Sequence, residues 1–562
     1  MNNDAAAIRE AGEASLAVLR AAHAQTSPQA RLSTLPSAVP RFAFRRRRQE
    51  AQIADVCMIV EGAYPYVSGG VSAWVHGVIS RQSDLRFCVV AILPEPPPPK
   101  PKYGAPPNLQ ALHHLYLSEA CARGGGLRPS SFKQAEFGSA ADAFLRGGGL
   151  AELASVERLM APLVKARRAT DLLDSTLAWN LVCDLYSREM PHESFLHFFW
   201  AWRALFGGLV ATLAFPLPPA RVYHTVSTGY AGLLAARAAV ETGRPAIITE
   251  HGVYTNERRI EILQADWIVD TIDKGFAIHD PRRDLRDFWS TAFESYARAC
   301  YEACTEVITL HGANQSAQLL HGAAPERMKI IPNGVDYCTL SRLSRAGTDD
   351  APTVALVGRV VPIKDIKTYI QAIEIVRPKF PGLTALVMGP TDEQPDYYEE
   401  CKAMVARLGL SGIVRFTGQV DITSYLPRVH VNVLTSVSES QPLSVLEAGA
   451  AAIPTVATNV GACREILLGR SDEHPALGAG GILTDVASPE QTAAAIGELL
   501  GDGDRRERQG RVMHQRVERY YDLNVVDDAY ATIYRHHMQA PLARLTDISK
   551  EVNARGRNRI CA

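Results

Sequence analysis

Short apolar runs that alternate with helical patterns constrain the fold of this chain more than any other feature of its sequence. Five runs in the first half have the length of buried strands, and helical stretches separate most of them: Ile53–Gly62, Arg221–Ser227, Pro245–Gly252, Thr305–Leu310 and Met328–Val335. After the polar stretch "SRAGTDDAPT" the alternation restarts with "TVALVGR", "LTALVMG", "GIVRFTG", "HVNVLTS", "IPTVAT" and "GGILTDV". Strands that alternate with helices predict parallel sheets. Two such series predict an α/β fold with two Rossmann-like, doubly wound domains.

The same pattern predicts the domain organisation. We expect an N-terminal extension, partly helical or flexible, over 1–50, and a Rossmann-like domain with a helical insertion over 51–340. A second Rossmann-like domain is expected over 350–515, a terminal amphipathic helix over 516–541, and a tail over 542–562. Helices of the second domain are expected at Lys364–Val376, Asp396–Leu408, Asp421–Pro427, Pro442–Ala450 and Gly461–Leu467. Two such domains imply a cleft between them, and ligands of doubly wound sheets bind beyond the carboxyl ends of the strands.

Composition and charge exclude several classes of protein. The 59 Lys and Arg residues balance 60 Asp and Glu residues, which argues against a nucleic-acid binder. A basic run at Arg45–Arg48 is a solvated lead-in, or else a contact to an anionic surface. Ten dispersed cysteines without a C-x-x-C pair favour a reducing compartment. The apolar stretch Phe195–Pro219 contains Arg203, His197 and a glycine pair, which favours a buried helix over a membrane span.

Two basic residues follow the first strand of the second domain, in "GRVVPIKD". Arg359 and Lys364 are expected to emerge from the strand end into the cleft, with Lys364 opening the next helix. A guanidinium fork and a compact ammonium suit a diphosphate. The alternative is a pair of solvated basic side chains.

The stretch "SESQPLSVLEAGA" places Glu439 in a loop and Glu447 inside the helix that follows. Pro442 suits the first helical position, so the N–H groups of Leu443 and Ser444 are expected to face the cleft, where a helix N-terminus favours an anion. Carboxylates accept from vicinal hydroxyls, which suits one of them to a sugar and the other to a ribose. The alternative is a capping box of Ser444 with Glu447.

Further candidates lie in the first domain. The turn at Gly69 and Gly70 can approach a ligand closely because glycine has no Cβ. In "TEHGVYTNER", Glu250, His251, Glu257 and Arg258 could reach the cleft from a strand end. The chain has no Walker A and no H-E-x-x-H motif, and the D-x-D at Asp502–Asp504 lies in a turn between helices, so no metal site is predicted.

Together these residues resemble the retaining family 4 glycosyltransferases of GT-B fold. The strongest matches are "GRVVPIKD", "IIPNGVD" and "SESQPLSVLEAGAAAIPTVATNVGACREIL", which contains the E-x7-E of the family at Glu439 and Glu447. The segments "EGAYPYVSGGVSAWVHGVI" and "TEHGVYTNERRIE" look like the PelF branch, the soluble glycosyltransferases of Pel exopolysaccharide systems. The resemblance covers about Ile53 to Met538 and implies that the terminal helix over 516–541 is a crossover helix that packs back on the first domain.

The resemblance implies roles for these residues. Arg359 and Lys364 would stabilise the departing diphosphate of a UDP-sugar, Glu439 would bind the hydroxyls of the sugar and Glu447 the ribose. His251 would lie by the reacting sugar and Gly69 and Gly70 by the phosphates, with Asn333, Leu443, Ser444, Glu257 and Arg258 also binding substrate.

The resemblance also implies substrates and partners. The donor would be UDP-N-acetylgalactosamine or UDP-glucose as co-substrate, with no cofactor or metal, and the acceptor a polysaccharide. The protein would be cytoplasmic and recruited to the inner membrane by proteins of the Pel synthase complex. Two other functions stay open on the same scaffold, a nucleotide-sugar epimerase and a non-catalytic UDP-sugar-binding scaffold.

Overall fold

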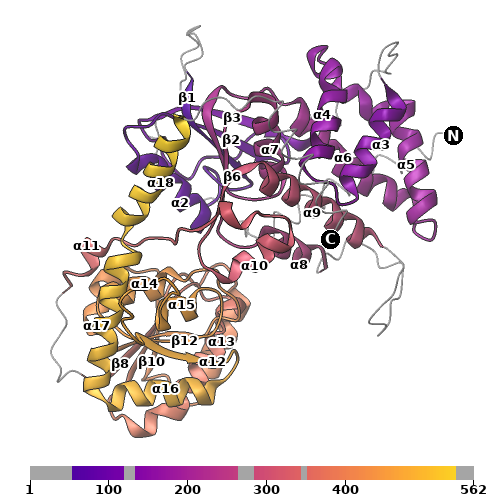
Figure 1. Cartoon of the computed structure of the whole chain (residues 1–562). Coiled ribbons are helices and arrows are strands. Elements are labelled where there is room, and N and C mark those ends of the chain that lie inside the picture. Colours follow the sequence, from indigo (N-terminus) through magenta and orange to yellow (C-terminus); the bar gives the residue numbers. More distant parts are fainter. Residues whose placement is uncertain (1–52, 119–132, 264–283, 344–350, 540–562) are drawn as a thin grey trace, which may run out of the picture. The chain divides into compact units, whose positions relative to one another are not determined.

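A computed structural model describes residues 53–118, 133–263, 284–343 and 351–539. The expected N-terminal helix, the basic run at Arg45–Arg48 and the C-terminal tail lie outside these residues. The chain divides into two compact units: unit 1 comprises 1–308, 316–329 and 531–562, and unit 2 comprises 309–315 and 330–530. Figure 1 shows the elements of both units.

Unit 1 contains a parallel sheet of seven strands in the order β3-β2-β1-β4-β5-β6-β7. The strands are β1 (Ala54–Glu61), β2 (Phe87–Leu93), β3 (Leu109–Tyr116), β4 (Ala220–Thr225), β5 (Ala246–Glu250), β6 (Cys304–Thr309) and β7 (Met328–Ile330). The register pairs Val56 with Phe87 on one side of β1 and with Val222 on the other. Since β1 and β2 are buried on both faces, they form continuous apolar runs rather than alternating ones.

The helices of unit 1 include an insertion between β3 and β4. They are α2 (Gly70–Arg81), α3 (Gln134–Leu145), α4 (Leu150–Lys165), α5 (Thr176–Glu189), α6 (Phe195–Ala214), α7 (Tyr230–Thr242), α8 (Tyr254–Leu263), α9 (Leu285–Ala303) and α10 (Ala313–Leu320), with short 3-10 turns at Ala169–Asp174 and Pro325–Arg327. Among the described helices, only α6 is long and apolar enough to cross a membrane, and 67% of its apolar window is buried inside the structure. This burial confirms the expected core helix.

Unit 2 contains a second parallel sheet, with six strands in the order β10-β9-β8-β11-β12-β13. Its strands are β8 (Thr353–Val357), β9 (Thr384–Met388), β10 (Val414–Gly418), β11 (Val431–Leu434), β12 (Thr455–Thr458) and β13 (Gly481–Thr484). They match the six runs expected from the sequence. Buried side chains such as Val354, Val387 and Val433 pack against Ile370 and Ile373 to form the core.

Helices lie around this sheet (Figure 1). They are α11 (Tyr337–Leu340), α12 (Ile366–Val376), α13 (Pro395–Arg407), α14 (Leu443–Ala450), α15 (Cys463–Leu468), α16 (Pro489–Gly501), α17 (Gly503–Tyr520) and α18 (Leu523–Met538), with 3-10 turns at Pro362–Lys364, Arg377–Lys379, Ile422–Ser424 and Leu426–Arg428. The chain of α18 passes from unit 2 to unit 1 at Ala531. Within unit 1, the hydroxyl of Tyr534 lies 2.7 Å from Nδ1 of the buried His224.

Several sequence expectations differ from the structure. The helix expected at Asp421–Pro427 is two separate 3-10 turns, Ile422–Ser424 and Leu426–Arg428. The side chain of Asp421 caps the first turn, and Pro427 lies at the start of the second, where it has no N–H to continue the first. The stretch expected as one crossover helix over 516–541 is interrupted at Tyr521 and Asp522, where Val335 pairs with Asp522 as an isolated bridge. Strands β2 and β3 and helix α3 were not predicted. Helices α16 and α17 were expected only as the helices on either side of the turn at Asp502–Asp504, without bounds, and the structure places Asp502 between them.

Candidate functional site

Both sheets have a topological switch point, where the strand order reverses. In unit 1 it lies between β1 and β4, and in unit 2 between β8 and β11. In parallel sheets the carboxyl ends of the strands at such a point frame the ligand site. A ligand is therefore expected near the residues that follow these four strands and the neighbouring β5.

In unit 2, the segment after β8 is fixed against the end of β11. The Thr435 hydroxyl donates to the backbone carbonyls of Lys364 and Asp365, at 3.0 and 2.9 Å. Asp365 has a left-handed backbone (φ 43°), and its side chain caps α12 by accepting from the N–H of Thr368. Lys364 therefore lies in a 3-10 turn just before the helix rather than in it, because Asp365 is the cap.

The Lys364 ammonium donates to the carboxylate of Glu439, and both side chains are largely buried, with exposed fractions of 17% and 13%. The Ser436 hydroxyl donates to the same carboxylate oxygen at 2.6 Å. A Cβ at Gly461, whose φ is +51°, would lie 2.1 Å from the carbonyl oxygen of Glu439. Glycine is therefore required at position 461, because any side chain there would collide with the backbone of the loop that carries Glu439.

Arg359 takes a different carboxylate partner. Its Nη1 donates to both oxygens of Glu393 at 2.6 and 2.7 Å, and about half of its side chain is exposed. The loop of Arg359 is held by the bond from the Val360 N–H to the carbonyl of Pro390. The Arg359 side chain is thus accessible to solvent at the strand end, whereas the Lys364 side chain is largely buried.

Helix α14 begins at Leu443, and Pro442 is its N-cap residue rather than its first helical residue as expected. The alternative of a capping box of Ser444 with Glu447 is therefore wrong. Ser444 lies in the first turn and Glu447 in the second, too far along to form that box. No side chain caps this end. Since the first N–H groups of a helix have no partner inside it, those of Leu443 and Ser444 are left to an external acceptor.

Glu447 is half-buried, and burial raises the pKa of its carboxyl above the usual range. A desolvated carboxylate is stabilised by hydroxyl donors. On the other side of the loop, the backbone N–H of Asn333 donates to the side-chain oxygen of Gln441 at 2.6 Å. Gln441 was not predicted, because a glutamine between two serine-rich turns gives no signal in the sequence.

In unit 1, Gly69 and Gly70 stand at the start of α2, where an added Cβ would meet nothing within 4 Å. His251 follows β5, with its ring 4.8 Å from that of Trp74 and perpendicular to it. Burial lowers the pKa of His251 to about 4, so its imidazole is neutral at pH 7. It can take part in hydrogen bonding but contributes no charge.

Arg258 and Glu257 lie on α8. Nη2 of Arg258 donates to the hydroxyl of Tyr254 at 2.8 Å, and that hydroxyl donates to Glu61 at the end of β1, at 3.0 Å. An added Cβ at Gly252 would lie 2.0 Å from a carboxylate oxygen of Glu257. Glu61 and Tyr254 belong to this cluster but were not predicted.

The expectation that Glu250 reaches the ligand side is wrong. Glu250 is fully buried and accepts from the hydroxyl of Tyr301 at 2.6 Å and from the side-chain amide of Gln318 at 2.8 Å. Burial raises the pKa of its carboxyl to about 7. It is a structural group beneath the turn that carries His251.

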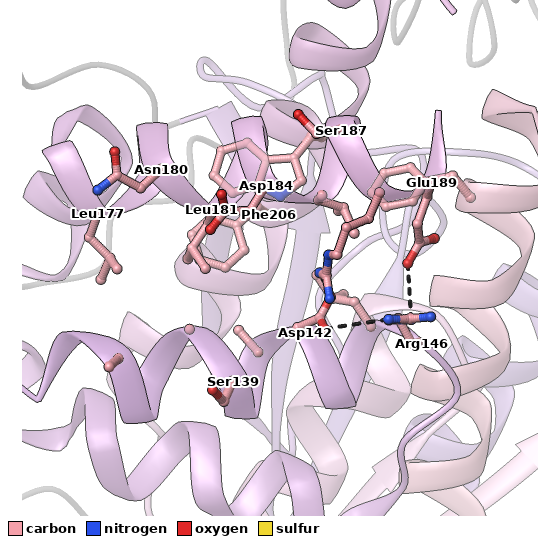
Figure 2. A pocket seen from close by; sticks show the side chains of 18 of the residues that line it. Ser139, Asp142, Arg146, Leu177, Asn180, Leu181, Asp184, Ser187, Glu189 and Phe206 are labelled. Atoms are coloured by element: carbon pink, nitrogen blue, oxygen red, sulfur yellow. Dashed lines mark hydrogen bonds and ion pairs between the residues drawn. The ribbon is translucent and has the colours of Figure 1, made fainter. Parts of the chain in front are cut away.

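A cavity of about 500 Å³ lies between α3, α5 and α6 of the helical insertion and α9. Figure 2 shows Leu181 and Phe206 among its lining side chains, and Arg146 in ion pairs with Asp142 and Glu189. None of the site residues expected from the sequence lines it. Across the described ranges, no three His, Cys, Asp or Glu residues gather as a metal would require.

Two family models match the chain. Residues 54–326 match a domain of unknown function (DUF3492), and residues 351–502 match the family described as glycosyl transferases group 1.

The curated relatives match over part of their length. The lipopolysaccharide core biosynthesis glycosyltransferase LpsE of Rhizobium meliloti is 28% identical over 207 residues, which is 36% of this chain and 56% of that protein. The D-inositol 3-phosphate glycosyltransferase of Kineococcus radiotolerans is 28% identical over 239 residues, 39% of this chain and 54% of that protein. The chain spans about half the length of the curated relatives it matches.

A solved structure extends the likeness to most of the chain. The crystal structure of Anabaena Alr3699/HepE in complex with UDP aligns with a TM-score of 0.50 at 14% identity, over 86% of this chain and 99% of that one. At this identity the match shows the fold, in which both sheets are Rossmann-like units of the GT-B type.

Proposed function

We propose that this chain, whose fold is GT-B and whose residues 351–502 belong to the glycosyl transferases group 1 family, transfers a sugar from a UDP-sugar donor to a growing exopolysaccharide. The sugar is a hexose or an N-acetylhexosamine, and the configuration at its anomeric carbon is retained. The observation that carries the proposal is the pair of Lys364 and Glu439 beside the uncapped start of α14, at the switch point of unit 2.

The donor binds in this proposal with its diphosphate at the start of α14. The N–H groups of Leu443 and Ser444 and the positive end of the helix dipole favour an anion there. Arg359 and Lys364 add positive charge from the neighbouring strand. That match of donors to a nucleoside diphosphate is why UDP, the ligand in the structure of the Anabaena protein, is the donor nucleotide proposed here.

The two carboxylates bind the hydroxyl-bearing ends of the donor. Glu439 is oriented by Lys364 and Ser436 and accepts from the hydroxyls of the sugar. Glu447, half-buried and with a raised pKa, accepts from the ribose hydroxyls. Asn333 borders the same loop through its bond to Gln441.

The transfer breaks the bond between the anomeric carbon and the diphosphate oxygen and forms a bond from the acceptor oxygen to the same face of that carbon. The proton of the acceptor hydroxyl passes to the departing diphosphate. Lys364 and Arg359 stabilise the charge that develops on the leaving group, an effect for which the loss of one donor typically costs roughly 3–4 kcal/mol of barrier. The reaction requires no metal in this proposal.

We assign the acceptor to unit 1, where His251 is neutral at pH 7 and the cluster of Arg258, Tyr254 and Glu61 offers polar groups that suit acceptor hydroxyls. The proposed roles of His251 toward the reacting sugar and of Gly69 and Gly70 toward the phosphates rest on the family resemblance. An added Cβ would meet nothing within 4 Å at either glycine. The PelF resemblance supports a polysaccharide acceptor, a cytoplasmic location and recruitment by inner-membrane Pel synthase proteins.

The experiment is a panel of UDP-glucose, UDP-galactose and their N-acetylamino forms, measured for protection against thermal unfolding and then for transfer. A stabilising ligand raises the melting temperature by mass action. The expected result is protection by one donor, followed by UDP release and an α-linked product from an α-linked donor. An isomerised UDP-sugar without acceptor would instead indicate an epimerase, and intact polymer production by Lys364→Ala would indicate a scaffold.

A further inference from the structure

Gln441 lies in the loop that enters α14, and only 7% of its surface is exposed. Its side-chain oxygen accepts the backbone N–H of Asn333 at 2.6 Å. The N–H of Asn333 can bond only to an acceptor, so the atom of the Gln441 amide that faces it is the oxygen. The Nε2 of Gln441 therefore points away from Asn333. Nε2 is buried and has no hydrogen-bond partner among the described residues.

The segments that hold Gln441 and Asn333 are each fixed by backbone contacts. Next to Gln441, the N–H of Ala462 donates to the carbonyl of Ser440 at 2.8 Å. Next to Asn333, a Cβ at Gly334 would lie 2.7 Å from the Cα of Leu523, and the N–H of Val335 donates to the carbonyl of Tyr521. The Asn333 N–H is therefore a rigid anchor, and the amide of Gln441 is pre-organised rather than free to rotate.

Buried polar groups in folded proteins are nearly always hydrogen-bonded, so an orphaned N–H₂ calls for a partner outside the chain. Gln441 stands two residues before Leu443, at the uncapped start of an eight-residue helix. The side chain of Gln441 and the backbones of Leu443 and Ser444 thus provide three N–H donor groups within four consecutive residues. A set of donors at a helix N-terminus is complementary to an anion.

We propose that Gln441 is a diphosphate-binding residue, whose Nε2 donates to a phosphate oxygen while its Oε1 stays bonded to Asn333. The nature of the anion, a nucleoside diphosphate, rests on the proposed function. The orientation of the amide does not, because it follows from the bond to Asn333.

The test uses Gln441→Glu in the full chain. Glutamate keeps an oxygen for the Asn333 N–H but replaces the N–H₂ with a carboxylate oxygen, which repels phosphate. Gln371→Glu on the exposed face of α12 is the control for the added charge. Binding of UDP and of inorganic pyrophosphate is measured by calorimetry, and binding of uridine by thermal shift.

The expected result is a loss of at least tenfold in affinity for both UDP and pyrophosphate in Gln441→Glu. Gln371→Glu should bind both as the wild type does, and all three proteins should respond equally to uridine and melt alike without ligand. If the unliganded Gln441→Glu melts early, Gln441→Met, which keeps the volume and lacks the donor, is measured in the same way.

The inference would be overturned if Gln441→Glu bound UDP and pyrophosphate as tightly as the unmodified protein does. It would also be overturned if the unmodified protein bound neither ligand. A wild-type protein that binds pyrophosphate but not UDP would overturn the proposed function alone. The pyrophosphate data would then still decide the role of Gln441.

Discussion

The ammonium of Lys364 is bonded to the carboxylate of Glu439, 75 residues further along the chain. The pair joins the segments that follow β8 and β11, the two strands between which the order of the sheet in unit 2 reverses. Both charges are largely buried, and Ser436 completes the bonding of the carboxylate. A buried pair at this position is better explained by a function than by stability, because desolvation offsets much of its attraction.

Lys364→Ala should reduce the turnover of the donor by about 10²–10³-fold, since it removes one donor to the leaving group. The chain should remain folded, because Lys364 lies in a short turn before α12 and not in the core. Lys367→Ala is the matched control, since Lys367 lies on α12 close to Lys364 in the chain and pairs with the exposed Glu400 of α13. Turnover and thermal unfolding are measured for both. Equal turnover in the two variants would contradict the role of Lys364.

Arg359→Ala and Glu393→Ala separate a role in binding from a surface ion pair. Both substitutions break the bond between Arg359 and Glu393. An exposed pair contributes at most about 1 kcal/mol to stability, so neither variant should unfold. Only Arg359→Ala should raise the KM for the donor and lower kcat. Steady-state kinetics on the two variants would contradict this account if both lost activity alike.

Gly461→Ala should destabilise unit 2 and lower donor turnover. Its positive φ alone costs roughly 1–2 kcal/mol for alanine. The added Cβ would also collide with the carbonyls of Glu439 and Ser440. Gly418→Ala isolates the first effect, because Gly418 has a φ of +68° and nothing within 4 Å of its Cβ position. Denaturant unfolding should show a clearly larger loss for Gly461→Ala; equal losses would mean that the loop is not held as described.

Glu250→Gln should stabilise the protein at pH 8 more than at pH 5. Burial raises the pKa of Glu250 from 4.5 to about 7, so the folded state favours the protonated carboxyl. Its stabilising contribution is complete below pH 4.5 and is lost as the pH rises through about 7. The change amounts to roughly 3 kcal/mol at most.

Glutamine suits this test because it can accept from Tyr301 and Gln318 as the acid does. The measurement is the difference in unfolding free energy between the variant and the wild type at the two pH values. If the difference in unfolding free energy between the two proteins did not grow with pH, the carboxyl of Glu250 would have the same pKa in the folded and unfolded states.

Much of the fold could be predicted because strand runs and helical stripes are local signals. All six strands of unit 2 follow from short apolar runs bounded by polar turns. Strand β3 was missed because Gln110, His113 and His114 interrupt its apolar pattern, and seven of its eight residues are only half-buried. The bounds of helix α17 were not predicted, because its apolar face is narrow, with Met513 and Val517 beside the buried Arg516.

The site was predictable to a lesser degree, because its geometry depends on contacts between distant segments. The spacing of Glu439 and Glu447 and the position of Lys364 suggested a donor site from the sequence alone. The burial of Glu250 beneath Tyr301 and the bond between Gln441 and Asn333 could not be predicted, since neither partner is near in sequence. Arg516, fully buried and bonded to Glu473, likewise gives no signal that separates it from the exposed arginines around it.

A crystal structure of the full chain with UDP would show directly where the nucleotide binds. We expect the diphosphate at the start of α14, within hydrogen-bond distance of the N–H groups of Leu443 and Ser444, with Lys364 turned toward it and Glu447 bonded to the ribose. A nucleotide bound anywhere other than the switch point of β8 and β11 would show that this is not a donor site.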